Sequence, residues 1–135
     1  MAGNLKYLPQ ITVSGDAFWV GTQQPDKFDA KGRYSMIVGN LSDAEIKKIE
    51  ATGAKVNFNP SKDYQGKFIK AKTGVKIAAY DLQGNPMGIV PNNSKITVTL
   101  TPAKYDFAGK EGINFWVDKK GVTVVEVADN NEVPV

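Results

Sequence analysis

Rings and lysines alternate with apolar side chains between Tyr64 and Tyr80, at a spacing of two residues. In an extended strand, alternate side chains point to opposite faces. One face would be apolar and belong to the core; it holds Ile69, Ala71, Val75, Ile77 and Ala79. The other would be basic and aromatic; it holds Tyr64, Phe68, Lys70, Lys72, Lys76 and Tyr80. Cations bracketed by rings can follow a phosphate backbone and stack unpaired bases.

A second group of rings and lysines lies between Thr101 and Ile113, in a segment expected to join two strands as a hairpin. The tip of this hairpin would carry Lys104, Tyr105, Phe107 and Lys110. Rings between lysines find little to pack against at such a tip, whereas each base stacked on a ring contributes about 1–3 kcal/mol. Tyr105 and Phe107 are therefore the strongest candidates for contact with bases.

Both groups also have purely structural interpretations. Lysines on an exposed strand prevent edge-to-edge aggregation, and Phe68 could fold over the core. Arg33 could reach a phosphate or a surface carboxylate. The orientations of Trp19 and Trp116 stay open, because each follows a phenylalanine that competes for the core. The predicted nucleic-acid contacts are Arg33, Tyr64, Lys67, Phe68, Lys70, Lys72, Lys104, Tyr105, Phe107 and Lys110.

The composition restricts the kinds of activity. The chain has 135 residues, enough for one domain with its own core. Cysteine and histidine are absent, which excludes disulfides, thiolate and imidazole metal ligands, and the familiar Ser-His and Cys-His nucleophile pairs. The carboxylates of Asp16, Asp26 and Asp29 do not form a convincing metal set. We therefore expect no enzyme activity, no cofactor and no bound metal.

The charge is modest but of one chemical kind. The formal net charge is +3, and all of the 17 basic residues except Arg33 are lysines. Lysine suits sequence-independent phosphate contact, whereas the bidentate reading of guanine favours arginine. The N-terminus lacks the apolar run of a signal peptide, and no stretch approaches the roughly 20 apolar residues of a membrane helix. A cytoplasmic protein without membrane contact is expected.

The elements that must position these residues are mostly strands. Alternation predicts strands at 11–19, with a bulge or bend at Gly15, and at 33–38 and 95–101. A short helix at 41–53 begins with Ser42 and Glu45 at capping-box spacing. The runs 113–117 and 122–127 form either a hairpin or one long strand with a bulge at Gly121.

These elements predict a mainly β domain over residues 1–127 and a flexible tail over 128–135. Segment 21–32 is expected to be a long loop. Five or six strands with one short helix after the second strand favour a small five-stranded barrel like the OB-fold. A β-sandwich is the alternative, because periodicity does not separate the two.

Several blocks of sequence occur in a characteristic order. Residues 31–38 precede the helix, 75–87 and 93–98 follow it, and 105–113 contain Gly-Lys-Glu-Gly before the last apolar run. From about residue 31 to residue 127, this succession resembles bacteriophage single-stranded DNA-binding proteins built on an OB-fold. The resemblance implies sequence-independent binding of single-stranded DNA in phage replication and recombination, without catalysis.

The resemblance also implies roles for particular residues. Tyr105 and Phe107 would stack bases, with Lys104 and Lys110 beside the backbone, whereas the contacts in the 64–80 strand come from strand parity alone. Many relatives recruit phage replication proteins through a strongly acidic tail, and two acidic residues, Asp129 and Glu132, are too few for one.

The sequence leaves several alternatives open. It does not decide between a monomer and a dimer, nor between DNA and RNA. The other functional hypothesis is a non-enzymatic structural or assembly module, such as a virion component. In that case the exposed rings would pack against a protein partner.

Overall fold

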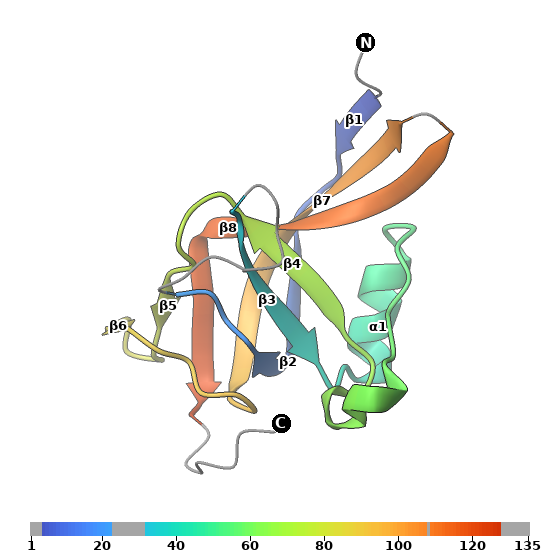
Figure 1. Ribbon diagram of the computed structural model, residues 1–135. Helices are drawn as coiled ribbons and strands as arrows, with labels where there is room; N and C mark the ends of the chain where they lie inside the picture. The colour runs from blue at the N-terminus through green and yellow to red at the C-terminus, as the bar shows by residue number, and fades with distance from the viewer. Residues whose placement is uncertain (1–3, 23–31, 108, 128–135) are drawn as a thin grey trace.

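Five strands close into a barrel in this computed structural model, which describes residues 4–22, 32–107 and 109–127 (Figure 1). They are β2 (Ile11–Phe18), β3 (Tyr34–Gly39), β4 (Ile69–Thr73), β7 (Lys95–Phe107) and β8 (Lys110–Glu126). Around the ring, β2 pairs with β3, β3 with β4, β4 with β8, β8 with β7, and β7 with β2 again. Within this ring of described strands, β4 and β8 are parallel and the other four pairs are antiparallel. The predicted OB-fold barrel is confirmed, and the β-sandwich alternative is wrong because the ring is closed.

The remaining strands and helices lie outside the ring of five strands. Strand β1 (Asn4–Tyr7) pairs with the far end of β7, and β5 (Ala79–Tyr80) joins β8 to β6 (Pro86–Met87). Helix α1 (Asp43–Glu50) follows β3, the second strand of the barrel, as predicted. A 3-10 helix, η1 (Pro60–Gln65), precedes β4.

Alternate residues of the barrel strands fill its interior. The buried positions of the predicted alternation on β7 are Ile96, Val98 and Leu100. They face buried side chains from the other four strands, including Val13, Val38, Ala71 and Phe115. A closed ring therefore buries one face of every strand, which leaves the other face for chemistry.

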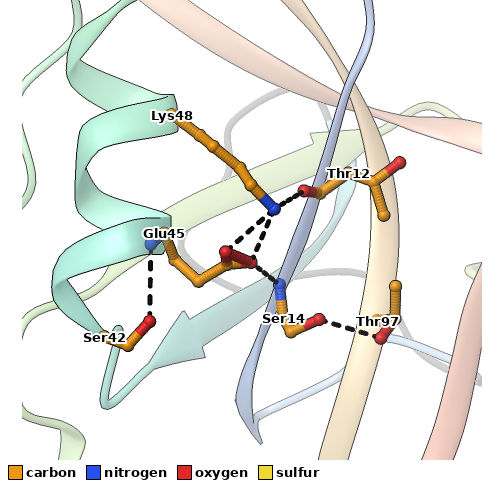
Figure 2. A network of polar contacts seen from close by, with 6 residues as sticks. All are labelled: Thr12, Ser14, Ser42, Glu45, Lys48 and Thr97. Carbon is orange, nitrogen blue, oxygen red and sulfur yellow. Dashed lines mark hydrogen bonds and ion pairs between the residues drawn. The ribbon is translucent and has the colours of Figure 1, made fainter.

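Two side chains of helix α1 complete the hydrogen bonding of β2 (Figure 2). Strand β3 pairs with residues 16–18 of β2, so the preceding residues of β2 have no strand partner on that side among the described residues. The carboxylate of Glu45 accepts the backbone N–H of Ser14 at 2.7 Å, and Nζ of Lys48 donates to the carbonyl of Thr12 at 3.2 Å. Glu45 and Lys48 also form an ion pair at 2.9 Å. The helix thus docks through polar contacts as well as through buried Ile46 and Ile49.

Of the two hydrogen bonds of the predicted capping box, the one accepted by Ser42 is present. The hydroxyl of Ser42 accepts the backbone N–H of Glu45 at 3.4 Å. The Glu45 side chain turns instead to the backbone N–H of Ser14 in β2 and to Lys48, which lies one turn further along the same helix.

The predicted continuous strand from Tyr64 to Tyr80 is wrong. Tyr64 lies in η1, and β4 covers only residues 69–73 before a bend at Gly74. Val75, expected in the core, is 69% exposed, whereas Ile77 and Ala79 are buried as expected. The bend takes Val75 out of the sheet, and the buried parity of Ile69 and Ala71 resumes at Ile77 and Ala79.

At Gly121 and Gly15, a neighbouring backbone carbonyl leaves no room for a Cβ atom. Strand β8 is one continuous strand, and its register against β7 shifts between Val98 and Leu100. The alternative of one long strand with a bulge at Gly121 is therefore correct. Gly121 has φ +73°, and an added Cβ would collide with the carbonyl of Ala78. Gly15 instead stays in register with β7, and a Cβ there would lie 2.6 Å from the carbonyl oxygen of Gly39.

Some predictions concern parts of the chain that lie outside the described residues. They are the tail at 128–135 and most of the loop at 21–32. Among the described helices, none is long and apolar enough to cross a membrane.

Candidate nucleic-acid interface

The outward face of the barrel carries a row of polar side chains across four strands. Ser35 of β3 pairs with Lys72 of β4, Lys72 pairs with Trp116 of β8, and Trp116 pairs with Thr101 of β7. Residues paired in register project to the same side of a sheet, so these side chains are neighbours on one surface. Lys70 lies two residues before Lys72 on the same side and is exposed. The lysine parity predicted for this strand is correct within β4.

Trp116 belongs to this outward face, which settles the orientation that the sequence left open. Its neighbour Phe115 takes the buried position, and the guanidinium of Arg33 lies 5.7 Å from the centre of the indole ring. A cation over an indole face is attracted by the ring quadrupole. The indole N–H is buried and has no acceptor among the described residues. Trp116 was not among the predicted contacts, although the parity of Phe115 could have identified it.

The other tryptophan is also turned outward. Phe18 is fully buried, and Trp19 follows it with φ +54° and an exposed side chain. The backbone N–H of Trp19 donates to Oδ1 of Asn92 at 2.9 Å. Strand β2 therefore ends at Phe18 in the core, and the exposed Trp19 follows it.

The far ends of β7 and β8, together with β1, form an arm that projects beyond the barrel (Figure 1). The predicted hairpin is confirmed, but its strands extend to the pair formed by Phe107 and Lys110, so residues 102–107 are strand and not loop. The side chains of Phe107 and Lys110 lie outside the described part of the structure. Their predicted DNA contacts stay predictions.

Tyr105 continues the face that holds Trp116. The cross-strand pairs Thr101–Trp116, Ala103–Asn114 and Tyr105–Gly112 succeed one another at intervals of two residues. A Cβ on Gly112 would collide with the Tyr105 ring, so this ring lies across the glycine. The ring therefore depends on Gly112 for its position.

Lys104 lies on the opposite face of the arm. It pairs with Lys6 of β1 and with Ile113 of β8, one residue out of phase with Tyr105. Lys104 and Tyr105 were both predicted at the tip of a loop, where adjacent side chains need not point to opposite sides. In paired strands they must point to opposite sides.

Tyr7 is a further ring on the Tyr105 face that the sequence did not indicate. It pairs with Ala103 and is 64% exposed. No local pattern predicted β1, since this four-residue strand is defined by its pairing with β7. The arm thus presents two tyrosines on one side.

Three other predicted contacts lie near the start of β4. Tyr64 packs its ring against buried Phe18, with ring centres 5.7 Å apart, so its predicted place on the strand face is wrong. Lys67 is exposed in the bend before the strand. Phe68 is half-buried and exchanges two backbone hydrogen bonds with Asn57. Of the three, Phe68 is in phase with Lys70 and Lys72.

Two solved structures that superimpose on this chain come from bacteriophages. The single-stranded DNA-binding protein from bacteriophage Enc34, in complex with ssDNA, superimposes with a TM-score of 0.66 over 90% of this chain and 89% of that chain, at 12% sequence identity. Bacteriophage T7 gp2.5, a single-stranded DNA-binding protein, gives 0.52 over 93% of this chain and 90% of that chain, at 15% identity. The fold is that of phage single-stranded DNA-binding proteins. Neither a protein-family model nor a curated protein sequence matches the chain.

Acidic side chains on this OB-fold barrel serve local structure. Asp16 accepts a hydrogen bond from Nδ2 of Asn40 at 2.8 Å and lies 3.7 Å from Nζ of Lys95. Asp26 and Asp29 lie outside the described residues. Within the described ranges, no three acidic side chains gather in a way that could hold a metal ion.

Proposed function

We propose that this protein binds single-stranded DNA without sequence preference in phage DNA replication or recombination, and that it does so without catalysis. The observation that carries the proposal is the single outward face on which Lys70, Lys72, Trp116 and Tyr105 gather, in a fold shared with phage single-stranded DNA-binding proteins. Such a face supplies both cations for phosphates and rings for bases.

The lysines and the rings would have separate tasks. Neutralising phosphates with Lys70 and Lys72 releases counterions and makes affinity fall with salt. Stacking on Tyr105 would contribute about 1–3 kcal/mol for one base. Neither contact registers the 2′-hydroxyl, so measurable RNA binding is expected as well.

Arg33 would change partners when DNA binds. Its guanidinium now lies over the Trp116 ring, where a base would stack. A base that takes this position would leave Arg33 beside the strand, where it can contact a phosphate. Quenching of Trp116 fluorescence by DNA is the expected signal.

The test is a titration of fluorescent oligo-dT at several salt concentrations. Binding should be tighter to single strands than to duplex, and the slope of log K against log salt should lose about 0.7 in Lys70→Ala and again in Lys72→Ala. Lys47→Ala, on the exposed side of α1, is the matched control and should keep the wild-type slope. The absence of a single-strand preference or of a salt slope would refute the proposal.

The same titration addresses the alternative of an assembly module. That hypothesis requires the arm to be covered by a protein partner. A stable oligomer that hides Tyr105 and ignores DNA would support it.

A further inference from the structure

A pocket lies in the fork where β4 and the arm separate. These strands pair only at Ala71–Phe115 and Lys72–Trp116, and they diverge toward Ile69 and Ile113. The segment after α1 crosses the open end of the fork, because its Asn57 bridges to Phe68 beside β4. The pocket is partly open to solvent and has a volume of about 400 Å³.

The floor and the rim of the pocket differ in chemistry. Ile69 and Phe115, which are 1% and 4% exposed, line the floor together with half-buried Ile113. The rim carries the exposed side chains of Lys55 and Lys70, the first from the segment after α1 and the second from β4. Asn57 also lines the pocket. The site therefore combines an apolar surface with two cations.

The pocket adjoins the face proposed to bind DNA. Gly112 forms part of its lining, and the ring of Tyr105 lies across the same glycine. On the opposite side, a Cβ added to Gly53 would lie 3.3 Å from Cδ1 of Ile113, so the segment after α1 approaches the arm closely. Ile113 and Phe115 are out of phase with Tyr105, so the pocket opens on the other side of the arm, and it shares Lys70 and Gly112 with the strands of the proposed DNA-binding face.

We propose that this pocket takes one nucleotide of the bound strand, with its base on Ile113 and Phe115 and its phosphate between Lys55 and Lys70. The volume falls within the range of roughly 300–1,000 Å³ typical of small-ligand pockets. The Asn57 carboxamide offers both a donor and an acceptor, so it can meet the edge of any base. The inference rests on the proposed single-stranded DNA binding and adds a subsite outside the stacking face.

The decisive measurement is NMR on the wild-type protein saturated with oligo-dT. Intermolecular NOEs are expected between thymine protons and the δ1 methyl of Ile113, and none are expected at Ile89, which is 66% exposed and does not line the pocket. Saturation without an NOE at Ile113 would overturn the subsite while leaving the proposed function intact. Failure to saturate at all would refute the proposed function itself.

A pair of lysine variants tests the phosphate contact. Lys55→Ala should lower the slope of log K against log salt by about 0.7. Lys47→Ala removes the same charge from α1, away from the pocket, and should leave the slope unchanged. Equal slopes for the two variants would overturn the assignment of Lys55.

Discussion

Strands β7 and β8 pass through two environments, the closed barrel and the projecting arm. Within the barrel, alternate residues such as Val98 and Leu100 are fully covered by the other strands. In the arm the alternation continues, but Lys104 and Asp106 are exposed. The pairing is the same, so burial is decided by whether the sheet closes on itself. The barrel is therefore where stability should be concentrated, and the arm is where side chains remain available for a ligand.

The largest expected effect comes from truncating the barrel part of β7. Leu100→Ala should lower the free energy of unfolding by about 2–5 kcal/mol, because it removes a fully buried side chain and leaves a cavity. Tyr105→Ala, on the same strand in the arm, should have a much smaller effect. Urea unfolding measures both, and equal losses would contradict the division between barrel and arm.

Two glycines with similar positive φ angles, one in the barrel and one in the arm, allow the packing of the two regions to be compared. Gly121 in the barrel and Gly109 at the tip of the arm have φ of +73° and +80°, so alanine at either position costs about 1–2 kcal/mol of backbone strain. At Gly121 the added Cβ also meets Ala78, which adds roughly 1–3 kcal/mol, whereas nothing lies within 4 Å at Gly109. Urea midpoints should therefore fall further in Gly121→Ala. A larger loss in Gly109→Ala would mean that the arm is as tightly packed as the barrel.

DNA affinity should depend more on the arm than on the barrel, the reverse of the order expected for stability. Tyr105→Ala should weaken oligo-dT binding by about 1–3 kcal/mol, or roughly 5-fold to 150-fold, because one stacking surface is lost. Tyr105→Phe keeps the ring and is the matched control, expected to bind like the wild type. Fluorescence anisotropy distinguishes them. A phenylalanine variant as weak as the alanine variant would assign the effect to the hydroxyl.

The polar contacts between helix α1 and strand β2 should stabilise the barrel. Glu45→Ala removes the acceptor of the Ser14 N–H and the partner of Lys48, and should cost about 1–3 kcal/mol. The exposed Glu50→Ala on the same helix is the control. If both variants unfold at the same urea concentration, the polar docking of α1 adds nothing to the barrel.

The smallest effect is expected at the β5–β6 turn, a second appendage of the barrel. Hydrogen bonds from the backbone and side chain of Asn85, and from the backbone of Gln83 and Gly84, lower the pKa of Asp81 below its usual value of 3.8. The turn therefore gains its stabilisation above the unfolded-state pKa and loses it as pH falls through the lower folded-state pKa. A carboxyl NMR titration should find this low pKa. An unshifted value would mean that the turn opens in solution.

Local patterns predicted the elements whose causes are local. The alternation at 95–101, the Ser42 cap and the bulge at Gly121 all depend on residues close together in the chain, and all are present. The 64–80 strand failed because a bend at Gly74 ended the alternation that had been extended to Val75. Strand β1 was missed because its hydrogen-bond partners are far away in sequence.

By itself, the sequence determined the mainly β class of the protein, the strands with clear alternation, the short helix, the outward lysines of β4 and the absence of cysteine and histidine side chains. These follow from residue type and short-range periodicity. Only the tertiary structure decided that Lys72, Trp116 and Tyr105 share one face, that Lys104 points away from it, and that a pocket opens beside Lys70. The physical reason is barrel closure, which pairs β4 with β8 and sets a register that neither strand specifies alone.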